Sequence, residues 1–334
     1  MALTEPNLTQ HAAALPGLDP ATYGRHSLHA ADCSWVEKNC YVDIWIELLH
    51  ALGLDPHAML AFTVAIDFEG DQWTFFKPPH EDLRTLYGVD VQELYVWRPL
   101  IDHAIEHLRA GQFISTEADA FWLPDTAGTD YRQRHTKTTI VLSEIDVAAR
   151  RLHYFHNASY FSLGGEDFIK TFRLDAAPDP SFMPLFAELV RHDRVTQESA
   201  QRLRLKSLQL LRKHINWRPQ DNPMQRFRAR FDHDLPAIAQ QGMDHYHAWV
   251  FGTLRQLGAA SELSAQYLRW LDPAPAARLE PSAAAFSEIS ALSKSLLLKI
   301  ARAVNAKRAL DASASFDDMA SAWDRATAGL SSLP

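Results

Sequence analysis

The spacing of apolar residues changes character at about residue 165, and this change limits the folds that the chain can adopt. Before it, strand-like and helix-like patterns are mixed. Residues 59–68 contain apolar side chains in alternation and predict a strand, and 71–76, an aromatic run bounded by glycine and proline, predicts a second strand. After it, helical spacing recurs in segments 185–190, 197–214, 224–239, 246–257, 262–270, 283–304 and 316–330. The pattern predicts an α+β domain followed by an all-α helical domain.

The first half also contains the elements expected to carry a functional site. Residues 91–110 show a helical apolar face, and 113–123 has the composition of a strand that runs into a loop. Two β-rich segments, 136–145 and 151–156, predict a hairpin. The Ala/Pro-rich stretch that starts at Asp175 is the expected junction. It divides the chain into an N-terminal extension (1–24), a first domain (25–174) and a helical domain (175–334).

The composition excludes several classes of function. Only 13 of the 334 residues are glycine, and neither a dinucleotide-binding nor a phosphate-binding glycine motif is present. No apolar run is long enough to span a membrane, and the N-terminus lacks the pattern of a secretory signal. Two cysteines do not make a disulfide framework, so a cytoplasmic location is expected. The net charge of −8 argues against binding to nucleic acid.

Cys40 is the leading candidate for a nucleophile. It opens a segment with one apolar helical face, Asn39 precedes it as a favourable N-cap, and Gly53 lies where the helix should end. A thiol in the first turn of a helix is near the positive end of the helix dipole, which favours the reactive thiolate. The alternative is that Cys40 is a small buried hydrophobic residue, as most free cysteines are. The other thiol, Cys33, is followed by no evident helix.

A cysteine nucleophile needs a base and a group that orients the base. His135 stands just before the strand at 136–142, and the partner strand of the hairpin leads to Asn157. Pairing of these strands is expected to bring Asn157 to His135, where its side chain can accept the imidazole Nδ1–H. Cysteine at a helix start, then histidine, then asparagine on successive strands is the papain-like order. Alternatively, His135 is a solvated loop residue, Asn157 caps a turn, or His156 takes the orienting role.

Other residues near these strands could contact a substrate or a metal. Asp119 ends a predicted strand and is placed to line a cleft, and we expect the substrate-binding set to be Asp119, Trp122, Asp125 and Tyr131. Alternatively, the acidic residues of this set cap helix N-termini or keep surface loops solvated. Histidine pairs at 103/107 and 153/156 are possible metal ligands. No HExxH motif or CxxC pair accompanies them, so we expect no metal site.

The helical half carries a local excess of positive charge. Residues 191–232 contain eleven Lys and Arg against four Asp and Glu, although the whole chain is acidic. One interpretation is a surface that docks an acidic partner, with Arg226, Arg228 and Arg230 as contacts. The other is an ordinary solvated helical face.

Three segments resemble a bacterial family of unknown function whose members are found beside carrier proteins and the ligases that charge them with amino acids. They are Asn39–Leu54 (NCYVDIWIELLHALGL), residues 67–77 (DFEGDQWTFFK) and residues 119–139 (DAFWLPDTAGTDYRQRHTKTT). More distantly, residues 25–165 are similar to the N-terminal domain of the butirosin-biosynthesis acyltransferase, of the papain-like cysteine clan. The relatives usually carry Asp in place of Asn157 and often a second histidine in place of Thr138.

The resemblance implies a papain-like cysteine-enzyme domain with Cys40 as nucleophile, His135 as base and Asn157 as orienting residue. The expected reaction is acyl or aminoacyl transfer from a carrier-protein phosphopantetheine thioester to a small-molecule amine. The thiolate would form an acyl-enzyme and the histidine would deprotonate the amine, so the protein would need no cofactor of its own. Two alternatives remain open: a cysteine hydrolase (a peptidase or amidase) with the same triad, and a non-catalytic scaffold that binds a carrier protein.

Overall fold

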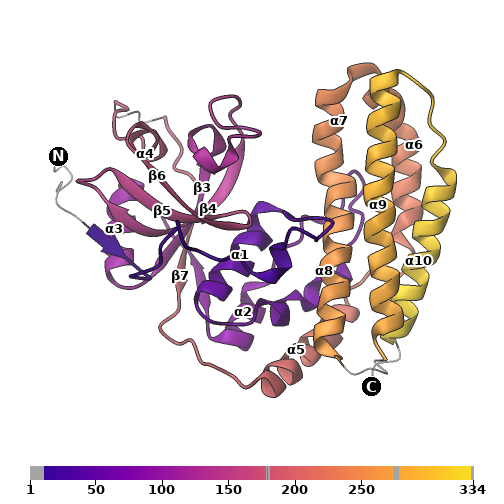
Figure 1. Cartoon of the computed structure of the whole chain (residues 1–334), viewed down its shortest axis with the longest axis horizontal. Helices are drawn as coiled ribbons and strands as arrows, with labels where there is room; N and C mark the ends of the chain where they lie inside the picture. The colour runs from indigo at the N-terminus through magenta and orange to yellow at the C-terminus, as the bar shows by residue number, and fades with distance from the viewer. Residues whose placement is uncertain (1–10, 178, 180, 274–277, 332–334) are drawn as a thin grey trace. The chain divides into compact units, whose positions relative to one another are not determined.

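The computed structural model describes residues 11–177, 179, 181–273 and 278–331, which form two compact units (Figure 1). The sheet unit consists of the described residues through Ser27, together with Asp43–Leu54 and Leu83–Gln197. The helical unit consists of Leu28–Val42, Asp55–Asp82 and the described residues from Glu198 onward. The chain therefore passes from one unit to the other several times, and each unit is described by itself.

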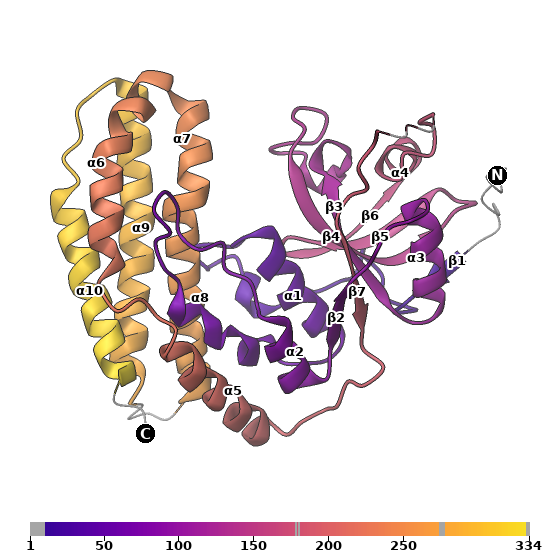
Figure 2. The same ribbon diagram turned by 180° about the vertical axis from the view of Figure 1, so that it is seen from behind.

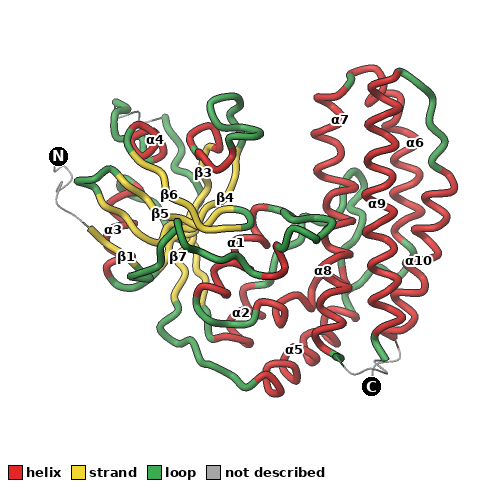
Figure 3. Tube along the Cα trace, viewed as in Figure 1, coloured by secondary structure: helices red, strands yellow, loops and turns green. Residues whose placement is uncertain are grey.

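The sheet unit is built on a seven-stranded antiparallel sheet with strand order β2-β7-β3-β4-β5-β6, in which β1 also pairs with β4 (Figure 3). The strands are β1 (His11–Ala13), β2 (Asp90–Glu93), β3 (Phe113–Asp119), β4 (Lys137–Asp146), β5 (Arg151–His156), β6 (Ser159–Gly164) and β7 (Ala187–Arg191).

The centre of the sheet is apolar on both faces. Ile140, Val141 and Leu142 are fully buried in β4, so a continuous apolar run rather than strict alternation marks this strand. Helix α3 (Leu100–Arg109) packs against β1, β3 and β4 with the apolar stripe expected from its sequence (Figure 2). The short helix α4 (Glu166–Thr171) packs against β6 and the 3-10 turn η3 (Ala120–Trp122).

Helices α1 (Cys40–Ala51) and α2 (His80–Tyr87) each begin in the helical unit and continue into the sheet unit. The strand predicted at 59–68 is wrong, because η2 (Pro56–Ala65) is a 3-10 helix that starts after the N-cap Asp55. Its side chains are buried on nearly all sides, so the alternation seen in the sequence was not the side-chain period of a strand. The strand predicted at 71–76 is reduced to a single bridge between Phe68 and Trp73.

Long helices dominate the helical unit. They are α5 (Ala200–Ile215), α6 (Pro223–Gln241), α7 (Met243–Val250), the π-helical turn η5 (Phe251–Arg255), α8 (Gln256–Leu271), α9 (Glu280–Ala306) and α10 (Ser313–Ser331). Helix α9 packs between α8 and α10, α6 packs on α10, and η2 packs on α5 and α8. Figure 1 shows α6, α8, α9 and α10 running alongside one another. None of the described helices is long and apolar enough to cross a membrane.

One predicted helix is a strand, and this moves the end of the sheet unit. Residues 185–190, read as helical, contain the start of β7, which pairs with both β2 and β3. A five-residue segment is too short for periodicity to separate helix from strand. The sheet unit therefore extends to Gln197, past the predicted boundary at 174. At the other end, residues 1–10 of the predicted extension lie outside the described residues, and His11–Ala13 joins the sheet as β1.

Candidate active site

Cys40 is the first residue of α1, as its sequence context predicts. The side-chain oxygen of Asn39 accepts hydrogen bonds from the backbone N–H groups of Tyr41 at 3.1 Å and Val42 at 2.9 Å. These bonds satisfy two of the free N–H groups at the helix start. Cys40 is half-buried and free. The other thiol, Cys33, lies in a turn, where its Sγ donates to the Leu28 carbonyl.

A histidine–aspartate pair lies where β3 ends and β4 begins, at one end of these two interior strands of the sheet. Nδ1 of His135 donates to Oδ2 of Asp119 at 2.6 Å, and the imidazole stacks on Phe121 with ring centroids 4.3 Å apart. Antiparallel pairing explains the contact: Asp119, the last residue of β3, faces Lys137, the first residue of β4, and His135 comes just before it. The His135 side chain is 69% exposed. A carboxylate on Nδ1 leaves Nε2 as a proton acceptor, the arrangement of a general base.

Asn157 does not occupy the position expected for the residue that orients His135. It lies in the two-residue turn between β5 and β6, where His156 pairs with Ser159, and its φ is 44°. The β4–β5 register pairs Val141 with Phe155, so position 157 lies level with position 139 and not with His135. Asn157 therefore performs the turn role that the sequence left open, since asparagine tolerates left-handed backbone. The group bonded to His135 is Asp119 instead.

A second histidine–aspartate pair lies inside the sheet unit. Nδ1 of His156 donates to Asp125 at 2.5 Å, and the hydroxyl of Thr138 donates to its Nε2 at 2.8 Å. The hydroxyl of Tyr154 also donates to Asp125, and burial, with the Asp125 charge, raises the pKa of Tyr154 far above its usual range. The side chains of His156 and Asp125 are 1% and 3% exposed. Asp125 was expected to bind substrate, but its carboxylate accepts hydrogen bonds from two side chains inside the sheet unit instead.

Sequence reasoning missed this network and the Asp119–His135 pair. The Asp119–His135 pair follows from the pairing of β3 with β4. The buried network joins Thr138 on β4 and His156 on β5 to Asp125, which lies in the 3-10 turn η4 (Pro124–Thr126). A hairpin between segments 113–123 and 136–145 could have been drawn from the sequence, and it would have placed Asp119 beside the residues that precede β4. The exact register was the missing information.

The other two expected substrate residues differ in their surroundings. Trp122 lines the same pocket as Asp119 and His135, a hollow of about 340 Å³. Three cationic side chains, Lys137, Lys170 and Arg173, also line this pocket. Tyr131 is instead tied to helix α4, because its hydroxyl donates to Asp167 at 2.9 Å. The guanidinium of Arg132 binds the same carboxylate at 2.6 Å.

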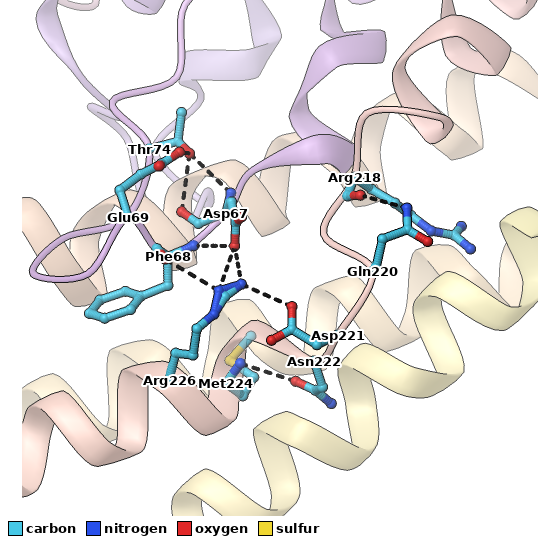
Figure 4. Close-up of polar contacts among 10 residues, drawn as sticks. All are labelled: Asp67, Phe68, Glu69, Thr74, Arg218, Gln220, Asp221, Asn222, Met224 and Arg226. Atoms are coloured by element: carbon cyan, nitrogen blue, oxygen red, sulfur yellow. Dashed lines mark hydrogen bonds and ion pairs between the residues drawn. The ribbon is translucent and has the colours of Figure 1, made fainter.

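The three arginines expected to contact a partner are all bonded within the helical unit. Arg226 donates to Asp67 at 2.6 Å and to Asp221 at 3.2 Å, and so links α6 to two loops (Figure 4). Arg228 donates to Asp317 at 2.7 Å, and Arg230 to Asp234 at 2.8 Å. Each arginine side chain is between 34% and 39% exposed. Much of their charge is therefore balanced inside the unit.

Two family models match the chain in succession. The DUF1839 N-terminal domain matches residues 24–192, and the DUF1839 C-terminal domain matches residues 200–332. The chain belongs to the DUF1839 family. The predicted membership of a family of unknown function is thereby confirmed. No protein with a curated description matches the chain.

The DUF1839 N-terminal domain contains Cys40 and both histidine–aspartate pairs, and the DUF1839 C-terminal domain contains the three arginines. The N-terminal domain ends directly after β7, and the C-terminal domain begins at the first residue of α5. The boundary between the two DUF1839 domains, at residues 192–200, thus lies later in the sequence than the predicted junction at 175. This boundary comes directly after the last strand of the sheet.

Proposed function

We propose that this DUF1839 protein is a cysteine acyltransferase that moves an acyl or aminoacyl group from a carrier-protein thioester to an amine. The observation that carries the proposal is the Asp119–His135 pair at a pocket of about 340 Å³, an imidazole held with Nε2 available for a proton. The N-capped position of Cys40 supports a reactive thiol independently. The resemblance of residues 25–165 to papain-like acyltransferases suggests the same chemistry.

The proposed reaction has two steps. The Cys40 thiolate attacks the thioester carbonyl, the C–S bond to the phosphopantetheine arm breaks, and the arm leaves as a thiol after it takes up a proton. An amine then attacks the new thioester on Cys40 and loses its proton to Nε2 of His135, and the amide leaves as the Cys40 thiolate is restored. Asp119 stabilises the imidazolium that forms. A positioned general base of this kind contributes about 10²–10⁴-fold to the rate.

The proposal is tested by intact-mass analysis after incubation with charged carrier proteins. We expect the protein to gain the mass of the acyl group and to lose it when an amine is added. Cys33→Ser is the matched control and should acquire the same adduct, whereas Cys40→Ser should acquire none. An adduct that persists in Cys40→Ser would overturn the assignment. An adduct discharged equally fast by water alone would favour a hydrolase, and carrier binding without an adduct would favour a scaffold.

We also propose that an acidic carrier protein approaches through the basic stretch at 191–232. Charge reversal of Arg226 would leave Asp67 and Asp221 unneutralised and disturb the helical unit itself. Arg228→Gln is a milder test, because its partner Asp317 is 66% exposed. We expect slower acylation by carrier-bound donor and an unchanged rate with a small free thioester. Equal rates with both donors would remove the docking role.

A further inference from the structure

The pocket that contains His135 adjoins a second hollow in the sheet unit, with a volume of about 320 Å³. Thr171, Arg173, Phe182 and Leu185 line both hollows. A single ligand can therefore lie partly in each. Asp119 and His135 are among the residues that line the first hollow. The second is lined mainly by apolar side chains, among them Trp97, Pro99, Leu100, Phe172 and Pro184, and also by the charged Arg98 and Asp179.

Arg173 lines both hollows. Its guanidinium lies 3.8 Å from the centroid of the Phe182 ring and forms no ion pair with any described residue. Asp179, which also lines the second hollow, has its pKa lowered by hydrogen bonds from Ser181 and further by the charge of Arg173. The lysines of the first hollow differ, because Lys170 is paired with Asp175 at 2.6 Å and Lys137 with Glu117 at 3.3 Å. A guanidinium group that stacks on an aromatic ring is well suited to bind a carboxylate through two parallel N–H···O hydrogen bonds.

Two buried polar atoms along these hollows have no partner among the described residues. Oγ1 of Thr171 is buried without a hydrogen bond, and so is Nε of Arg98, which lines the second hollow. Buried hydroxyl and N–H groups are nearly always hydrogen-bonded in folded proteins. Unsatisfied atoms at two points along one hollow indicate that a polar ligand completes the site.

The second hollow is open and rich in aromatic surface. Trp97 is 66% exposed and Phe182 is 40% exposed, although both rings border a concave site. Exposed apolar surface gathered in this way is typical of a ligand-binding groove. The apolar area matches a large hydrophobic side chain, whereas the guanidinium of Arg173, which lines both hollows, matches an anion.

We propose that the two hollows bind an α-amino acid with an aromatic or large aliphatic side chain, and that this amino acid is the amine acceptor. The carboxylate binds Arg173, the side chain occupies the hollow beside Trp97, and the amino group lies on the His135 side. This assignment rests on the proposed acyl transfer. It narrows the acceptor from any amine to an amino acid.

Ligand-observed NMR or calorimetry with four compounds tests the assignment: L-phenylalanine, L-alanine, phenethylamine and phenyl phosphate. We expect L-phenylalanine to bind, and both L-alanine and phenethylamine to bind at least about tenfold more weakly. Arg173→Gln should weaken L-phenylalanine binding by about 10- to 100-fold, the loss expected for a charge-assisted hydrogen bond. Arg173→Asn is the second variant, because asparagine suits the φ of 55° at this position.

Arg150→Gln is the matched control. Arg150 is exposed, also has a positive φ of 51°, and does not line either hollow, so its replacement should leave binding unchanged. The inference is overturned if L-phenylalanine does not bind, if folded Arg173 variants bind it normally, or if phenethylamine binds equally well. Tighter binding of phenyl phosphate would also overturn it. No acyl donor is present, so these outcomes are independent of whether Cys40 is acylated.

Discussion

Asp119 holds the imidazole of His135 through a bond of 2.6 Å between Oδ2 and Nδ1, and the same carboxylate accepts the backbone N–H of Phe121 at 3.1 Å. One side chain therefore fixes both the histidine and the turn that carries Trp122. The ring of Phe121 in turn stacks on the imidazole. The orientation of His135 thus depends on a short segment just after β3.

Replacing Asp119 with Asn should reduce acyl transfer by about 10²–10⁴-fold while the protein stays folded. The amide can donate to Nδ1 and would favour the tautomer whose Nε2 carries the proton. Nitrogen NMR of the His135 ring, recorded together with turnover, reports this change. Glu117→Gln removes a carboxylate two residues earlier on the same strand and should leave both measurements near those of the original protein. A normal rate in Asp119→Asn would mean that His135 is not the base.

Cys40 should react with iodoacetamide well before Cys33, as mapped by peptide mass analysis. The cap made by Asn39 supports this difference, so Asn39→Ala should slow Cys40 labelling. It should lower the unfolding free energy by about 2–3 kcal/mol, because the buried amide also donates to the carbonyl of Phe76 at 3.1 Å. Asn39→Ser restores a capping oxygen and should recover the labelling rate, but it cannot replace the bond to Phe76 and should recover only part of the stability. Faster labelling of Cys33 in the original protein would contradict the choice of nucleophile.

Replacing His156 with Leu should lower the unfolding free energy by about 3–5 kcal/mol, because a buried Asp125 would lose its charged or hydrogen-bonded partner. Thr138→Val removes a single neutral bond from the same ring and should cost about 1 kcal/mol. Urea unfolding distinguishes the two effects. Similar small losses in both variants would show that the Asp125–His156 pair does not stabilise the sheet unit.

Asp90 links the edge strand β2 to β7 and gives stability that depends on pH. Hydrogen bonds from Gln92, and then from Arg191 and Arg84, hold the pKa of Asp90 well below its usual range. A depressed pKa stabilises the fold above the pKa of the unfolded state, about 3.9, and that contribution is lost as the pH falls below it. Asp90→Asn should therefore cost about 1–2 kcal/mol at pH 7, and the difference should shrink below about pH 4.

Glu93→Gln, which changes an exposed carboxylate at the other end of β2, is the control and should leave the free energy of unfolding at pH 7 close to that of the original protein. Chemical unfolding between pH 3 and pH 7 measures both variants. A difference between Asp90→Asn and the original protein that grows on acidification would reverse the sign and refute the assignment.

Local sequence patterns were sufficient for long helices and for the β4–β5 hairpin. Helix α1 begins at the predicted Cys40, and α9 and α10 lie close to their predicted ranges, because many apolar positions repeat at helical spacing. Short elements failed: β7 was read as helix and η2 as strand. η2 is buried on nearly all sides, which replaces a periodic pattern with uniform burial. β7 has only five residues, too few for periodicity to separate a strand from a helix.

The sequence indicated most of the individual residues of the candidate site, but not which of them contact one another. His135 and Asp119 were both singled out, yet for different roles, because their contact depends on the β3–β4 register. A shift of one residue turns each side chain to the other face, so a sequence without turn constraints does not fix such a contact. The contact of Asp125 with His156 joins the 3-10 turn η4 (Pro124–Thr126) to β5, and no local pattern in the sequence marks it.

The interleaving of the two units restricts how such a chain can evolve. The 3-10 helix η2 precedes the family boundary in the sequence, yet it packs on α5 and α8, which follow that boundary. Recombination between residues 192 and 200 would combine η2 of one protein with α5 and α8 of another, and their packing surfaces would not match. The two DUF1839 domains therefore cannot be exchanged independently between members of the family. We expect them to share one line of descent, with substitutions in η2 matched by substitutions in α5 and α8.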